Sequence, residues 1–292
     1  MKNSRHYHLN PPSLAALYGK AIMPGFSRKP ANPVAGDIPS LDASLTGART
    51  GTPDLHLYRR ICGFPTSSQC PITWPHILVF PLHMRLLTDD AFPLPLLGLL
   101  HLRNSITQHR AISQGECLDL TCHLDNATDT DRGIEFDAIT QAHVGNQLVW
   151  EEVSTFLFRK PNPKTDRSGS QPAAPELLSG QATIKAPEDI GRRYAQVSGD
   201  RNPIHLHALS AKAFGFPRAI AHGMWSKARC IALIEEYEGA LGAARVEAQF
   251  KKPLLLPGSA LLTWDRNKAD QRFRLLKGDA SAPHIEGSLT RL

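Results

Sequence analysis

The sequence predicts an α+β protein in which a long buried helix is wrapped by an antiparallel sheet, and in which this unit occurs twice. Three observations support this fold class. Several short runs rich in β-branched and aromatic residues are separated by Asp, Asn and Gly, as in strands joined by turns. One long segment is apolar around most of its circumference, as in a buried helix. The same order of elements occurs on both sides of a segment rich in Pro, Ser and Gly, which indicates a duplication.

Residues 1–50 are expected to form an N-terminal arm. Five of the 33 basic residues of the chain precede its first acidic residue, Asp37, and Pro12–Met23 has the pattern of a short amphipathic helix. The arm lacks the apolar core of a secretory signal. A transit peptide remains an alternative, because the first 36 residues contain no acid. We expect an ordered or semi-ordered arm on a cytoplasmic protein.

The first repeat is expected at residues 51–160. It begins with an irregular, proline-rich and helical part, and its strands are predicted at Glu116–His123, Gly133–His143 and Gln147–Arg159. The longest apolar run, Phe92–Leu102, is interrupted by prolines and is shorter than the roughly 18 residues that a membrane span needs. No membrane span is therefore expected.

The second repeat is expected at residues 177–292, after a linker at residues 161–176 that contains almost no bulky apolar residue. The segment His222–Tyr237 has no helix breaker after Gly223 and is predicted as the buried helix of this repeat. The predicted strands are Gln181–Lys185, Arg245–Lys252, Ala260–Asp265, Arg272–Leu276 and Ile285–Leu289.

Composition excludes several classes of protein. Hydrophobic residues make up 41% and charged residues 21%, as in globular proteins. The net charge of +6 comes mostly from the N-terminal arm, since the remaining 28 basic residues nearly balance the 27 acidic ones. A nucleic-acid partner is not expected without a basic stripe on the body of the protein. Five cysteines with no Cys-x-x-Cys pair indicate neither a disulfide framework nor a zinc site, and they suit a reducing compartment.

The segment Tyr194–His205 carries the strongest functional indication. It places Asp200 and His205 five residues apart, with Gly199 and Pro203 interrupting any helix between them. The two side chains can therefore converge from a rigid loop, where a carboxylate and an imidazole together can hold and deprotonate one water molecule. A turn followed by a surface histidine is the plainer interpretation of this spacing alone.

The two repeats can be compared at this loop. Leu78–His83 matches Asp200–His205 in its proline and histidine but has no acid, and a Phe-Pro pair follows in both copies. Continuing the match pairs Gly98 with Gly223 at the start of the predicted helix. On this comparison the first repeat kept the shape of the loop and lost its chemistry. His83 is then a structural residue or part of the wall of a tunnel.

The second half resembles the MaoC-like dehydratases, the family that contains the (R)-specific enoyl-CoA hydratases. The matching residues are an aromatic residue followed by Ser-Gly-Asp-x-Asn-Pro-Ile-His, at Tyr194 and 198–205, then Phe216-Pro217 and Ala221–Met224. The resemblance implies a double hot-dog fold, in which each long helix lies along a curved antiparallel sheet. It also implies reversible syn addition of water to a trans-2-enoyl thioester of CoA or acyl-carrier protein, giving an (R)-3-hydroxyacyl thioester.

The chemistry of this reaction agrees with the residues. We assign water activation and proton transfer to Asp200 and His205, and stabilisation of the enolate oxygen to the Gly223 amide at the start of the buried helix. No metal and no cofactor are expected. The residues expected to bind the substrate or orient the water are Ser198, Asn202, His222, Arg218 and Lys251.

Two other functions remain open. A hot-dog thioesterase would also use a carboxylate and an oxyanion helix, and a non-catalytic acyl-binding subunit would need only the cavity. We further expect Pro93, Pro95 and Gly98 to open room for an acyl chain at the start of the first repeat's helix. Either a monomer or a homodimer is compatible with two fused repeats.

Overall fold

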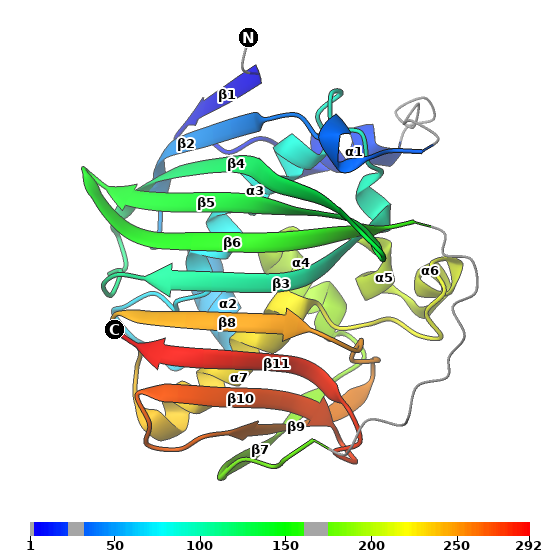
Figure 1. The fold of residues 1–292 in the computed structure, drawn as a ribbon. Helices are drawn as coiled ribbons and strands as arrows, with labels where there is room; N and C mark the ends of the chain where they lie inside the picture. The colour runs from blue at the N-terminus through cyan, green and yellow to red at the C-terminus, as the bar shows by residue number, and fades with distance from the viewer. Residues whose placement is uncertain (1–2, 23–31, 161–174) are drawn as a thin grey trace.

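The computed structural model describes residues 3–22, 32–160 and 175–292 (Figure 1). Eleven strands form one continuous sheet in the order β1-β2-β4-β5-β6-β3-β8-β11-β10-β9-β7. Residues 161–174 of the predicted linker lie outside the described residues. The strands are Asn3–His8 (β1), Leu41–Arg49 (β2), Leu99–Gln108 (β3), Cys117–Thr130 (β4), Gly133–Val144 (β5), Gln147–Arg159 (β6), Gly180–Ala186 (β7), Ala244–Phe250 (β8), Gly258–Trp264 (β9), Asp270–Lys277 (β10) and Pro283–Arg291 (β11).

The sheet consists of two five-stranded halves with one extra strand at an edge. β2, β4, β5, β6 and β3 form the first half, and β8, β11, β10, β9 and β7 form the second, with antiparallel pairing throughout. β3 pairs with β8 from Arg103 opposite Gln249 to Gln108 opposite Ala244. This pairing, which we call the seam, joins the halves into one sheet. β1 adds to the edge by parallel pairing with β2.

Each half holds one long helix, α3 (Trp74–Leu87) or α7 (Gly223–Glu238), and both lie behind the sheet in the view of Figure 1. Most residues of each helix are buried, as predicted for α7 from its apolar circumference. Two helices wrapped by one curved sheet form the double hot-dog architecture. The other helices are α1 (Leu14–Ile22), α2 (Pro53–Cys62), α4 (Ile190–Ser198), α5 (Pro203–Leu206), α6 (Ala208–Ala213) and the 3₁₀ turns η1 (Ala35–Asp37) and η2 (Leu96–Gly98).

A single large apolar core extends through both halves. Its largest buried side chains include Trp74, Trp150 and Trp225. The indole N–H of each donates to a backbone carbonyl, at 3.1, 2.8 and 3.1 Å respectively. Because a buried polar atom without a partner costs about 1–3 kcal/mol, these bonds let the indole rings fill the core without that penalty.

The predicted strands are all present, although β4 continues to Thr130, beyond its predicted end. The helices predicted near residues 12–23 and 222–237 correspond to α1 and α7. Within the described ranges, no helix combines the length and apolarity needed to cross a bilayer.

The expected match between the repeats is wrong. Leu78–His83 lies inside α3 rather than in a loop, and Gly98 ends η2 and leads into β3, a strand that the sequence analysis missed. The match fails because a shared proline and histidine do not distinguish a loop from a helix here, since the buried packing of α3 accommodates Pro81 inside the helix. The helix of the first repeat therefore does not start near Pro93 and Pro95.

The arm expected at residues 1–50 already contains two strands. Within β2, Leu41, Ala43 and Leu45 are buried while the residues between them are not, which is the alternation of a half-buried strand. β2 pairs with β4, so the sheet of the first repeat begins at Leu41. We propose residues 41–160 and 177–292 as the two repeats.

Candidate active site

The loop between α4 and α5 has a fixed backbone. Gly199 ends α4 in the left-handed region, with φ of 72°, which glycine adopts without a steric cost. A Cβ at this position would collide with Leu14 of α1. Pro203 occupies the first turn of α5, and the Asn202 side-chain oxygen accepts from Ile204 N at 3.3 Å. The predicted helix breakers Gly199 and Pro203 thus lie at the end of α4 and the start of α5, with the loop between them.

Asp200 accepts hydrogen bonds on one carboxylate oxygen and leaves the other toward the histidines. Its Oδ1 accepts from Asn202 N at 3.1 Å and from the Tyr18 hydroxyl at 3.2 Å. Burial raises the pKa of Asp200, but His222, His205 and these donors outweigh burial, so the pKa lies below its usual value. Asp200 is therefore ionised at neutral pH, with 29% of its side chain exposed.

His205 has a defined tautomer. Its Nδ1 lies 2.8 Å from the carbonyl oxygen of Ile220, which cannot donate, so Nδ1 carries the proton. Burial lowers the pKa of His205, although Asp200 opposes this effect. The neutral ring therefore presents Nε2 as a proton acceptor. An imidazole in this state can serve as a general base.

His222 packs directly on His205, with ring centroids 3.8 Å apart and an angle of 28° between the rings. Its Nε2 donates to the backbone carbonyl of Asp200 at 3.0 Å and lies 3.7 Å from Asp200 Oδ2. Burial, followed by His205, lowers the pKa of His222 to about 3. One carboxylate oxygen of Asp200 and one ring nitrogen each of His205 and His222 all lie within 4.8 Å of one another. A neutral His222 can thus hold the loop that carries Asp200.

Gly223 is the first residue of α7. Its N–H belongs to the first turn, whose amides have no intrahelical acceptor and lie at the positive end of the helix dipole. A Cβ on Gly223 would lie 2.9 Å from the Phe250 ring, so glycine is needed for this close approach. The position suits an amide that must meet a developing negative charge.

These residues line one cavity of about 660 Å³ that draws its walls from both repeats. Ser198 also lines it, and its hydroxyl donates to the Tyr194 carbonyl while accepting from Asp200 N at 3.1 Å. The first repeat supplies mainly apolar residues, among them Phe80, Met84, Leu87, Leu96, Leu97 and Phe156. The volume and this lining suit a long apolar ligand.

The predicted cationic residues are placed differently from one another. Lys251 and Lys252 line the cavity, and Lys251 Nζ also contacts Gln249 at 2.8 Å and Glu286 at 3.1 Å. Arg218 is exposed and does not belong to the cavity wall. Arg159, which the sequence analysis did not single out, does line the cavity.

Tyr18 is the residue that sequence reasoning missed. It comes from α1, and its hydroxyl donates to Asp200 Oδ1 and accepts from Arg201 N at 2.9 Å. Only 9% of Tyr18 is exposed, and burial followed by the Asp200 charge raises the pKa of its phenol well above the usual value. A contact across 182 residues leaves no local pattern in the sequence.

Comparisons with known proteins agree with this geometry. The model of the MaoC-like domain family matches residues 167–287. A curated relative, 3-hydroxyacyl-thioester dehydratase X of Mycobacterium tuberculosis, is 34% identical over 267 residues, which cover 90% of this chain and 94% of the relative.

Solved structures show the same fold over nearly the whole chain. The crystal structure of HtdX from Mycobacterium tuberculosis aligns with a TM-score of 0.75 and 31% identity, covering 86% of this chain and 100% of that chain. A MaoC-like dehydratase from Phytophthora capsici aligns with a TM-score of 0.73 and 18% identity, covering 89% and 98%.

Proposed function

This chain belongs to the MaoC-like dehydratase family, and from this premise we propose that it catalyses the reversible hydration of trans-2-enoyl thioesters to (R)-3-hydroxyacyl thioesters. The observation that supports the proposal most directly is the convergence of Asp200, His205 and the Gly223 amide on one cavity. The name of the 34% identical relative, a 3-hydroxyacyl-thioester dehydratase, describes the same reaction in the dehydration direction.

Asp200 and His205 together can orient a water molecule. Both the ionised carboxylate and the His205 Nε2 atom are acceptors, so one water can donate a hydrogen to each and turn its lone pair toward Cβ of the substrate. As the oxygen attacks Cβ, the pair takes the water proton and returns a proton to Cα. Both transfers occur on one face of the double bond, as syn addition requires, and leave the enzyme's protonation unchanged.

The Gly223 amide is assigned to the thioester oxygen. Attack at Cβ moves negative charge onto this oxygen, and a preorganised donor at a helix N-terminus stabilises that charge. One such donor contributes about 10²–10³ in rate, while the acid–base pair contributes about 10²–10⁴. His222, Asn202 and Ser198 are assigned to holding the loop, because each contacts the Asp200 or Ile204 backbone.

The carrier that holds the thioester is proposed to bind next to the cationic residues of the cavity wall. Lys251 and Lys252 are proposed to meet the phosphates of CoA or of an acyl-carrier protein, whereas Arg218 would have to act outside the cavity.

We also propose a cytoplasmic location, supported by five free cysteine thiols. Assembly as a monomer or a homodimer belongs to the same proposal, because the seam already pairs two repeats within one chain.

A spectrophotometric assay tests the function. With a trans-2-enoyl-CoA, hydration removes the absorbance of the conjugated thioester without releasing a thiol, and chiral analysis of the product distinguishes the (R) from the (S) alcohol. Release of free CoA would instead indicate a thioesterase, and binding without either change would indicate a non-catalytic subunit.

Asp200→Asn is the matched test of the assigned acceptor. We expect the rate to fall about 10²–10⁴-fold with the fold intact, because the amide cannot accept the water proton. Asp189→Asn, at an exposed carboxylate before α4, provides the control and should keep wild-type activity. Full activity of the Asp200 variant would remove this residue from the mechanism.

A further inference from the structure

The wall that the first repeat contributes to the cavity is not uniformly apolar. His76 and His83 of α3 and His101 of β3 line the same cavity as the loop that carries Asp200 and His205. The His76 ring centroid lies 5.8 Å from that of His83 and 6.5 Å from that of His101. A tunnel that served only an unsubstituted hydrocarbon chain would gain nothing from three imidazoles. We call these three residues the imidazole cluster.

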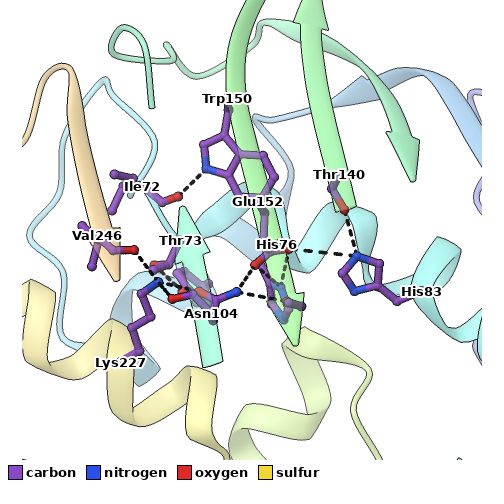
Figure 2. A network of polar contacts seen from close by, with 12 residues as sticks. Ile72, Thr73, His76, His83, Asn104, Thr140, Trp150, Glu152, Lys227 and Val246 are labelled. Carbon is purple, nitrogen blue, oxygen red and sulfur yellow. Dashed lines mark hydrogen bonds and ion pairs between the residues drawn. The ribbon is translucent and has the colours of Figure 1, made fainter. Parts of the chain in front are cut away.

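A buried network of polar contacts joins His76 and His83 of the imidazole cluster to Glu152 (Figure 2). Glu152, from β6, has a fully buried side chain and accepts from His76 Nδ1 at 2.8 Å and from Asn104 Nδ2 at 2.6 Å. Asn104 Oδ1 accepts from Lys227 Nζ of α7 at 2.5 Å. Lys227 Nζ has two further acceptors, the carbonyl oxygens of Val246 at 3.0 Å and Asn104 at 3.2 Å. The network crosses the seam and fixes the orientation of the Asn104 amide.

The network leaves imidazole nitrogens without partners. His76 uses Nδ1 for Glu152, and His83 places Nε2 at 3.0 Å from the Thr140 hydroxyl, so among the described residues no hydrogen bond reaches the second nitrogen of either ring. His101 has no hydrogen bond on either nitrogen within the described chain, and its Nε2 is fully buried. The nitrogens that carry no hydrogen bond and are not enclosed, His76 Nε2, His83 Nδ1 and His101 Nδ1, can take a partner from solvent or from a ligand in the cavity.

The imidazole cluster lies one aromatic ring away from the reaction centre. The His101 and Phe250 centroids are 4.9 Å apart, and Phe250 is the ring that packs against Gly223. An acyl chain whose thioester lies at Gly223 and whose tail enters the first repeat therefore passes Phe250 before it reaches His101.

The charge of the cluster selects the ligand group. Burial lowers the pKa of His83 to about 4 and of His101 to about 3, so both rings are neutral at pH 7. Burial raises the pKa of Glu152, but His76 and the neighbouring donors lower it to about 2, so a negative charge lies behind the rings. A carboxylate placed beside the rings would be repelled by that charge. A hydroxyl, which donates and accepts at once, suits neutral imidazoles of either tautomer.

We propose that the imidazole cluster is a second recognition site, which binds a hydroxyl group carried on the acyl chain at a distance from the thioester. The preferred substrates are then enoyl thioesters with a distal hydroxyl rather than plain fatty acyl thioesters. This inference rests on the proposed hydratase function and adds the class of acyl chain. A divalent metal on His76, His83 and Glu152 is the competing interpretation of these residues. It would displace the donors that already occupy the carboxylate.

The test uses a set of trans-2-enoyl-CoA substrates of one chain length, in which a single hydroxyl is moved along the tail. For at least one position we expect kcat/KM about threefold to tenfold above that of the unsubstituted chain, the effect of one hydrogen bond. His101→Phe should abolish this preference, measured as the ratio of kcat/KM on the hydroxylated and unsubstituted chains, because the phenyl ring offers no hydrogen-bonding nitrogen. His101→Gln, which keeps hydrogen-bonding groups, should retain part of the preference.

His109→Phe provides the matched control, since His109 directly follows β3, is exposed and lies outside the cavity wall. Its hydroxyl preference should equal that of the wild type. Equal kcat/KM for all substrates, or a preference unchanged in His101→Phe, overturns the proposal. Stoichiometric metal in the purified protein that is lost in Glu152→Gln also overturns it, in favour of a metal site.

Direct binding separates failure of this inference from failure of the proposed function. Calorimetry with Asp200→Asn and saturated acyl-CoA ligands, with and without the distal hydroxyl, needs no turnover. Tighter binding of the hydroxylated ligand that disappears in the Asp200→Asn, His101→Phe double variant supports the recognition site even if no enoyl-CoA is hydrated. Equal binding of both ligands refutes the recognition site even if hydration is fast.

Discussion

Replacing Tyr18 with Phe removes one hydroxyl from the active site and nothing else. That hydroxyl lies 3.2 Å from Asp200 Oδ1 and accepts from Arg201 N at 2.9 Å. It therefore connects α1 to Asp200 and Arg201 of the loop. The ring stays in place, because it is buried against the apolar residues of α1 and α3. The substitution therefore asks how much the N-terminal helix contributes to the carboxylate that we assign to water activation.

The expected loss follows from the charge of the acceptor. A hydrogen bond to a charged group contributes about 1.5–3 kcal/mol, and every 1.4 kcal/mol corresponds to a tenfold change in rate. If the bond mainly fixes Asp200 in the reactive position, kcat/KM should fall about tenfold to a hundredfold. The folded state should lose only about 1–2 kcal/mol, because the amide of Arg201 can turn to water in a partly exposed loop.

The pH profile distinguishes this role from a structural one. The Tyr18 bond is among the interactions that lower the pKa of Asp200, after His222 and His205. Its removal raises that pKa, so a smaller fraction of Asp200 is ionised at any acidic pH. The acidic limb of kcat/KM should therefore move to higher pH. A variant that is only less stable would lose activity without moving this limb.

The assay is hydration of a trans-2-enoyl-CoA by wild type and Tyr18→Phe from about pH 4 to 9, with thermal denaturation of both proteins. Tyr237→Phe, at a tyrosine that is 55% exposed at the end of α7, should match the wild type in every measurement. An unchanged acidic limb together with an unchanged kcat/KM at neutral pH would refute the assignment of Tyr18 as a positioning residue.

Two further predictions concern the helix α7. Gly223→Ala should lower kcat more than it raises KM, because its Cβ would press on Phe250 and displace the amide, and Phe250→Leu in the same protein should restore part of the rate. Burial, opposed by Glu152, lowers the pKa of Lys227 from 10.5 to about 7, so the unfolded chain binds more protons between these values and stability rises with pH. Lys227→Met lacks this rise, so its deficit in melting temperature against the wild type should be larger at about pH 9 than at about pH 7; an equal deficit at both would contradict the lowered pKa.

The geometry of the loop between α4 and α5 could be predicted because its determinants are local. Gly199 marks the end of α4 and Pro203 the start of α5. Asp200 lies between them and His205 follows Pro203 by two residues. The buried helix α7 could be predicted equally well, because apolar residues around the whole circumference of a helix can be recognised from its own sequence. Tyr18 could not be predicted in this way, because it lies 182 residues from Asp200 in the sequence and contacts it only in the folded chain.

The first repeat was harder to predict because one residue type gave the wrong indication. Pro81 suggested a loop, so α3 was not recognised and β3 was missed. Had α3 been assigned, His76 and His83 would have fallen seven residues apart on one face of a helix, which indicates a shared environment. The contacts of both histidines with Glu152, and of His76 with His101, depend on strand pairing and lie beyond any local pattern.

The seam between β3 and β8 has an evolutionary consequence. Because it fuses two sheets that carry different parts of the cavity, substitutions on α3, β3 and β6 can alter which tails are accepted while the loop before α5 stays untouched. On the proposed function, a substitution in the first half can change the preferred acyl chain without changing the residues assigned to the chemical step. Descendants of such a chain could exchange one acyl pool for another by drift in a single half, with their reaction inherited intact.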